Sequence, residues 1–237
     1  MSGWAAKRFW DNATVELAGH AFEVRLDGRP VRTPLKAPLH VPTAKMAEAI
    51  AVEWQAQTGL VDPRTMPVTR SANAAIDKVA PQHEGVCQML ASYGETDLLC
   101  YRAPGPDTLM ARQSQAWDPL LDWAADRFTA PLVTTQGVIP IAQYQASIAI
   151  LHHAVSSYRP FSLTAVHDLI TLSGSLILGL AVAEQWISAD SGWNLSRIDE
   201  DWQVEQWGAD DEAAEMAITK RDAFLHAAAF LDLSNQA

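Results

Sequence analysis

Four carboxylates and two tryptophans fall within the ten residues DEDWQVEQWG, positions 199–208. Groups of carboxylates can serve as general acids and bases, bind cations, or form a charged surface. On a helix, Asp201 and Glu205 would stack one turn apart, and the small repulsion between them is tolerated on any exposed face. A catalytic pair would need one buried carboxylate, because burial raises its pKa. The pattern leaves open an acid/base site, a metal site, a protein-binding rim and a solvated acidic face.

The use of tryptophan favours the protein-binding interpretation. The chain has nine tryptophans and only four tyrosines, and Trp193, Trp202 and Trp207 surround the acidic segment. Tryptophan is enriched at binding hot spots because it combines a large apolar area with one N–H donor. Other tryptophans belong to the core. The helical spacing of Trp54 from Ile50, for example, predicts a core position.

Motifs for nucleotide or metal chemistry are weak. LSGSLILG, residues 172–179, is glycine-rich, but it lacks the lysine of a phosphate-binding loop, so its small residues predict close helix packing. His83 and Cys87 are four residues apart and could face one metal ion on a helix, but two ligands do not make a site. Cys100 is the only other thiol, and its direction cannot be predicted. We therefore predict no metal and no cofactor.

Composition narrows the function classes. The 237 residues carry a net charge of −11, which disfavours nucleic acid or an anionic membrane as a partner. Two isolated cysteines indicate a reducing compartment rather than a disulfide framework. The apolar run at 169–183 is too short to span a membrane, and predicts a buried helix.

The sequence periodicity predicts strands first and helices afterwards. Residues 14–17 and 20–26 are short strand candidates, and the second alternates as a half-buried strand does. Asp27-Gly28 is typical of a tight turn before the return segment RPVRT. Thr43 is a good N-cap for a helix that ends near residue 58. The remaining predicted helices are 67–79, 82–93, 107–128, 141–157, 162–173, 175–187, 194–206 and 210–232.

This order predicts an α+β fold, with a small β-rich N-terminal domain followed by a larger all-helical domain. We place the first domain at residues 1–60, ending in a helix, and the second at 61–237. The segments 97–102 and 131–140 are the main breaks between the later helices.

Eight segments, taken in order, resemble the assembly chaperones that hold the α subunit of the ATP synthase catalytic head, the F(1) sector, in mitochondria and related bacteria. The resemblance extends from Lys7 to the last helix. The segments are KRFW (7–10), LDGRPVRTPLKAPLHVPT (26–43), AIAVEWQAQ (49–57), DPRTMPVTRSANAAID (62–77), ETDLLCYRA (95–103), WDPLLDW (117–123), SGSLILGLA (173–181) and SRIDEDWQVEQWG (196–208).

The resemblance implies a chaperone that is not an enzyme and does not use ATP. Such a protein binds the isolated α subunit, prevents its aggregation and releases it when β subunits take its place. Such protection is needed because an α subunit without its neighbours exposes apolar surface, which promotes aggregation. We expect the acidic helix to supply part of this temporary cover, through Glu205 first, and then through Asp199, Glu200, Trp202 and Trp207.

Two other interpretations stay open. One is a small-molecule enzyme that uses Asp201 or Glu205 as acid or base in a cleft between the domains. The other is a permanent structural subunit of a larger complex. We expect a monomer when free, with no membrane insertion. The absence of a secretory signal or an Arg/Ser-rich presequence before Lys7 favours the cytoplasm, or the mitochondrial matrix for a eukaryotic chain.

Overall fold

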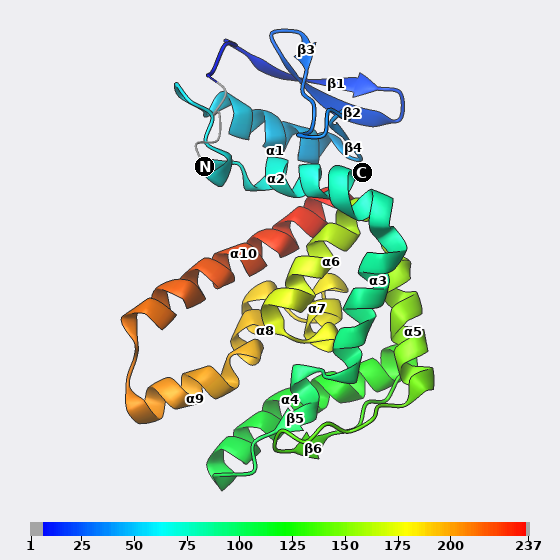
Figure 1. Cartoon of the computed structure of the whole chain (residues 1–237), viewed down its shortest axis with the longest axis vertical. Helices are drawn as coiled ribbons and strands as arrows, with labels where there is room; N and C mark the ends of the chain where they lie inside the picture. Colours follow the sequence, from blue (N-terminus) through cyan, green and yellow to red (C-terminus); the bar gives the residue numbers. More distant parts are fainter. Residues whose placement is uncertain (1–6, 236–237) are drawn as a thin grey trace. The chain divides into compact units, whose positions relative to one another are not determined.

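A computed structural model describes residues 7–235 (Figure 1). Strands near the N-terminus are followed by a long succession of helices, which confirms the predicted α+β class. The chain divides into two compact units. The first unit contains the chain up to Gln82 with two later segments, and the second contains the rest. The domain boundary at residue 60 stays a prediction.

The predicted hairpin is the main feature of the first unit. β1 (Ala13–Ala18) and β2 (Ala21–Leu26) pair antiparallel along their full lengths, and the chain turns at Gly19, whose φ is 68°. At the next turn Asp27 and Gly28 both adopt positive φ, 46° and 79°, as a tight hairpin turn requires. Val24 and Leu26 are buried as the alternation predicts, but Glu23, a polar position of that pattern, is buried as well, where Arg25 and His40 pair with its carboxylate.

Two short strands complete this sheet. β3 (Arg29–Pro30) pairs with the end of β2, and β4 (His40–Val41) pairs with its beginning. The predicted return strand RPVRT is regular only over β3. The chain reverses just beyond it, where the Lys36 N–H donates to the Thr33 carbonyl at 2.9 Å.

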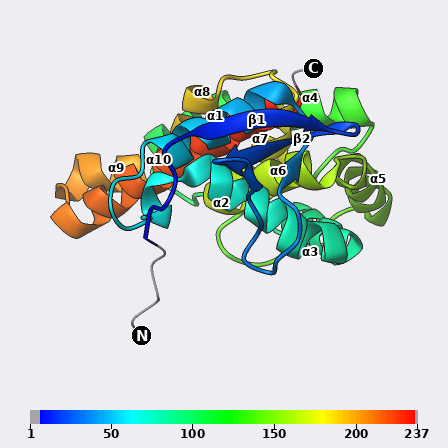
Figure 2. The ribbon, with the colours of Figure 1, turned by 90° about the horizontal axis from the view of Figure 1, so that it is seen from above.

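The first long helix, α1 (Ala44–Gln55), begins where predicted. The Thr43 hydroxyl accepts the Met46 N–H at 3.1 Å, which satisfies one of the free N–H groups at the helix start. Met46, Ala47 and Ile50 are completely buried and face the sheet. Figure 2 shows the β1–β2 hairpin lying across α1. Burial of this apolar face stabilises the first unit.

The later segments of the chain join this unit through side-chain hydrogen bonds. The Thr43 hydroxyl also donates to the Leu233 carbonyl at 2.6 Å, near the end of the last helix. Asp77 accepts the Thr33 hydroxyl at 2.7 Å. Trp54 is half-buried and its ring meets that of Trp10 edge-on at 5.3 Å, which is the predicted packing role.

Apart from the range 194–206, the helices predicted beyond residue 60 are present, with shifted ends. The range 67–79 is α-helical only in its first part and continues as a π-turn, η2 (Ala75–Val79). The short 3₁₀ turns are η1 (Pro63–Thr65), η3 (Ala80–Gln82), η4 (Tyr93–Glu95) and η5 (Leu98–Cys100). The α-helices are α2 (Pro67–Ala74), α3 (His83–Ser92), α4 (Asp107–Phe128), α5 (Gln145–Ser156), α6 (Pro160–Ser173), α7 (Leu176–Ala183), α8 (Ala189–Ser196), α9 (Ile198–Trp207) and α10 (Asp211–Asn235).

The prediction of one helix over 194–206 is wrong. The chain leaves the helical conformation at Arg197, with φ −107° and ψ 6°, so α8 and α9 are separate helices. The Ser196 hydroxyl donates to the Trp193 carbonyl at 2.7 Å and competes with the backbone for that acceptor. The break at Arg197 lets α9, which carries the acidic segment, run in a different direction from α8.

The apolar run 169–183 is two buried helices rather than one. Gly174, with φ 71°, ends α6, and α7 follows at once with nearly every residue buried. A Cβ at Gly179 would lie 2.4 Å from Ile170 Cγ1, so the predicted close packing of small residues is confirmed. Within residues 7–235 no helix combines the length and apolar character needed to cross a bilayer.

A small sheet in the second unit was not predicted. β5 (Tyr101–Arg102) runs parallel to β6 (Thr135–Gln136), and the Gly137 N–H extends the pairing with a bond to the Arg102 carbonyl at 2.8 Å. Both strands lie in segments that the sequence pattern marks only as breaks. Strands of two residues are too short to produce a periodic signal.

Candidate partner-binding surface

The acidic segment forms α9, and α9 lies against α4 within the second unit (Figure 1). Arg112 of α4 donates two hydrogen bonds to Glu205, at 2.8 and 2.9 Å, in a bidentate pair. The guanidinium carbon of Arg112 also lies 4.9 Å from the centre of the Trp202 ring. One arginine therefore holds both a carboxylate and an indole of α9 in place.

A second link joins α4 to the first turn of α9. The Gln113 side chain is completely buried, and its amide donates to the Asp199 carboxylate at 2.6 Å. The amide oxygen of Gln113 accepts the Ala103 N–H at 2.8 Å. Asp199 is therefore a positioning group on the inner side of α9, with one oxygen committed to a buried partner.

A groove of about 410 Å³ opens beside these links. Its apolar lining comes largely from Trp202 and Trp207 on one side and Pro106 and Leu109 on the other. Trp207 is 78% exposed, and Val204 one turn before it is 46% exposed. The indole at the end of α9 thus offers a large apolar area that no described residue covers.

The remaining acidic residues of α9 face solvent. Asp201 is exposed, and Glu200 pairs with Arg197 at 3.1 Å. Of the five predicted site residues, three surround the groove, namely Asp199, Trp202 and Trp207. Glu205 braces the groove through Arg112, and Glu200 lies outside it.

The electrostatics of Glu205 differ from those of a general acid. The hydrogen bond from Arg112 lowers the pKa of the Glu205 carboxyl below its ordinary value. A general acid near neutral pH needs a raised pKa, which burial without a cation would give. The side chain is half exposed and already ion-paired, so its geometry suits binding rather than proton transfer.

The other candidate ligands are occupied in the structure. His83 Nε2 lies 2.8 Å from the Tyr158 carbonyl, and His83 Nδ1 lies 3.7 Å from Cys87 Sγ. Burial raises the pKa of the Cys100 thiol to about 12, which keeps it protonated. Residues 7–235 contain no cluster of three or more metal-ligating side chains.

Arg112 and Gln113 were missed by sequence reasoning. They lie about ninety residues before α9, and no local pattern connects the two segments. One signal was available: Gln113 stands four residues from both Leu109 and Trp117, on a stripe that is otherwise apolar and buried. A lone polar residue on such a stripe needs a partner, and Asp199 is that partner.

The chain is similar to several known proteins. A family profile described as ATP12 chaperone protein matches residues 7–125. The crystal structure of Atp12 from Paracoccus denitrificans superimposes with a TM-score of 0.95 at 49% identity, over 98% of this chain and 100% of that one. A protein from Agrobacterium tumefaciens gives a TM-score of 0.90 at 39% identity, over 97% and 86% of the chains. The mitochondrial protein atp12 of Schizosaccharomyces pombe is 22% identical over 222 residues, 89% of this chain and 76% of its own length.

Proposed function

Because the chain belongs to the ATP12 chaperone family, we propose that it assists ATP synthase assembly by transiently binding the isolated α subunit of the catalytic head. It covers apolar surface that β subunits later occupy, and β displaces it. No catalysis is required. Reversibility follows if the contact with β is larger or better packed than the contact with the chaperone.

The observation that supports this proposal is the exposed indole of Trp207 beside the groove between α4 and α9. A large aromatic side chain left in water at a groove rim is typical of a binding hot spot. The links through Arg112 and Gln113 fix α9 on α4, so little conformational entropy is lost when a partner docks. The family match ends before α9, and this assignment therefore rests on the geometry.

The acidic residues of α9 give this surface a negative charge. α9 carries the carboxylates of Asp199, Glu200, Asp201 and Glu205, and among the described residues only Glu200 and Glu205 of these pair with an arginine, so the helix keeps a net negative charge beside the apolar patch. Charge of one sign keeps copies of the free chaperone apart while the tryptophan stays exposed. The same charge selects a partner whose apolar patch has a neutral or basic rim.

The test is the refolding of α subunit followed by light scattering, with wild-type protein and single variants. We expect Trp207→Ala to weaken suppression of aggregation by about tenfold in the concentration required, since an anchor side chain is lost. Val138→Ala is the matched control, because Val138 is 91% exposed and lies outside the groove. If both variants protect α as the wild type does, α9 is not the binding surface.

The same assay tests the role of Glu205. Glu205→Ala removes the carboxylate that holds Arg112 over Trp202, and we expect weaker α binding without loss of the folded state. Glu215→Ala, on an exposed face of α10, removes the same charge elsewhere. Equal binding by the two variants would exclude Glu205 from the site.

A further inference from the structure

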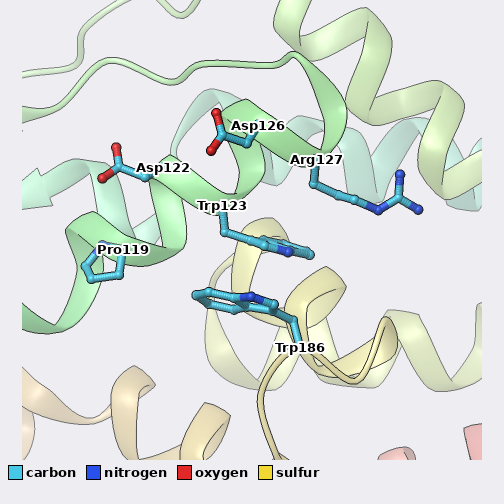
Figure 3. Close-up of a pocket in the computed structure, with 6 residues that line it drawn as sticks. All are labelled: Pro119, Asp122, Trp123, Asp126, Arg127 and Trp186. Atoms are coloured by element: carbon cyan, nitrogen blue, oxygen red, sulfur yellow. The ribbon is translucent and has the colours of Figure 1, made fainter.

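A second groove in the same unit combines stacked indoles with uncompensated carboxylates. Trp123 of α4 and Trp186, in the turn after α7, stack with ring centres 5.2 Å apart and planes 20° apart. Figure 3 shows the two rings face to face, with Asp122 and Asp126 on the same helix as Trp123. The groove has a volume of about 560 Å³, and Trp186 is 45% exposed.

The turn that carries Trp186 is held in an unusual conformation. Gln185 has a φ of 58°, in the left-handed region that non-glycine residues seldom adopt. The Trp186 N–H donates to the Ala181 carbonyl at 2.9 Å and fixes the turn on the end of α7. The ring of Trp186 is thus presented to Trp123 by local backbone structure, at a position where it stays partly in water.

The charges at this groove are unbalanced. Among the described residues that line the groove, Arg127 is the only cation, and it already donates to both oxygens of Glu184 at 2.7 and 3.1 Å. Asp122 and Asp126 are exposed and form no ion pair with any described residue. Asp122 and Asp126, one helical turn apart, line the same groove as the indole pair, and no cation among the described residues pairs with either carboxylate.

We propose that this groove binds an arginine side chain of the chaperone's client. A guanidinium can donate to Asp122 or Asp126 while its flat face lies on indole, and it sheds water more easily than an ammonium. The chain uses the same arrangement internally, where Arg112 lies on Trp202 and donates to Glu205. The identity of the client as the α subunit rests on the proposed function. The arginine chemistry rests on the groove alone.

The first experiment needs no client. Indole N–H signals are followed by NMR during titration with N-acetylarginine amide, and Trp123→Phe and Trp186→Phe assign the two signals. We expect saturable shifts of these two signals and smaller ones with N-acetyllysine amide. The neutral isostere N-acetylcitrulline amide should give none. No response to the arginine derivative, or equal responses to the charged and neutral compounds, would overturn the proposal.

The second experiment uses the client. Asp122→Asn/Asp126→Asn should weaken α-subunit binding about tenfold, as for loss of a charge pair at an interface. Glu215→Gln/Asp222→Asn makes the same change of charge on exposed positions of α10 and should bind as the wild type does. If wild type and the first double variant bind α equally, the groove is not a client site. If wild type fails to bind α but the arginine titration succeeds, the proposed function fails and the groove proposal stands.

Discussion

Asp97 is a completely buried carboxylate that connects two distant segments of the second unit. It accepts the Ser175 hydroxyl at 2.7 Å and the Ile177 N–H at 3.1 Å, both at the start of α7, and the Leu99 N–H at 3.0 Å. Burial raises the pKa of its carboxyl to about 6, and the hydrogen bonds offset part of that increase. Asp97 therefore has a structural role, because its hydrogen bonds hold the Leu99 backbone and Ser175, the N-cap of α7, in place.

Replacement by the isosteric amide tests this role. In Asp97→Asn the new NH₂ group must face at least one N–H that the carboxylate accepted, and a buried donor loses its partner. We expect the free energy of unfolding to fall by about 1–3 kcal/mol, measured by urea denaturation. Unchanged stability would mean that the site rearranges to accept the amide.

The raised pKa of Asp97 also predicts a pH dependence. The unfolded carboxyl has a pKa near 3.9, so the native chain keeps this proton to higher pH than the unfolded chain does. Its contribution to stability is therefore largest at low pH and is lost as the pH rises from about 4 to about 6. The stability advantage of wild type over Asp97→Asn should be smaller at about pH 7.5 than at about pH 5.5. An equal advantage at both would contradict the assigned pKa.

Composition and the family resemblance indicated Trp202, Trp207 and Glu205 as candidates, and their role in binding stays a prediction. Their partners on α4 were not predicted. The pairing of Glu205 with Arg112 depends on how two helices pack, and a single sequence holds no signal for that contact. The expected repulsion between Asp201 and Glu205 is relieved by Arg112, a cation on α4. The sequence holds no signal for that contact either.

At the scale of elements, helix contacts depend on small residues at a few positions. A Cβ at Gly179 would meet Ile170 Cγ1 at 2.4 Å and the Ile170 backbone at 3.0 Å, so α7 can approach α6 only with glycine there. Gly85 of α3 has no heavy atom within 4 Å of the same position and a normal helical φ. Both glycines lie in helices, so the two positions differ chiefly in the space available for a Cβ.

We expect Gly179→Ala and Gly85→Ala to change stability in opposite directions. The first overpacks the α6–α7 contact and should lower the free energy of unfolding by about 1–3 kcal/mol. The second removes backbone freedom from the unfolded chain and should raise it by about 0.4–1 kcal/mol. Thermal and urea denaturation measure both. Unchanged or raised stability in Gly179→Ala would contradict the overpacking, and lost stability in Gly85→Ala would contradict the expected gain at an open helical position.

The elements themselves were predicted unevenly. The hairpin and α1 followed from alternation, a turn dipeptide and an N-cap, which are local signals. The separation of α8 from α9 at Arg197 did not, because apolar spacing continues across it while hydrogen bonds of Ser196 end the helix. The β5–β6 pair depends on contacts between residues more than thirty positions apart.

At the scale of the whole molecule, the net charge of −11 and the exposed apolar groups serve one purpose under the proposed function. We expect the charge to keep copies of the free protein apart, while Trp207 and Trp186 remain exposed to a partner. A permanent subunit would bury these indoles in a large apolar interface. A transient chaperone needs a contact strong enough to hold the client and weak enough to lose it.

The most direct test of the account is size-exclusion chromatography of freshly refolded α subunit, alone, with this protein, and then with β subunit added. The account predicts aggregation of α alone, a soluble mixed complex with the chaperone, and release of the chaperone when β arrives. Co-elution that persists after β is added would contradict transient binding and identify a permanent subunit. Equal aggregation of α with and without the protein would contradict the assignment of the client.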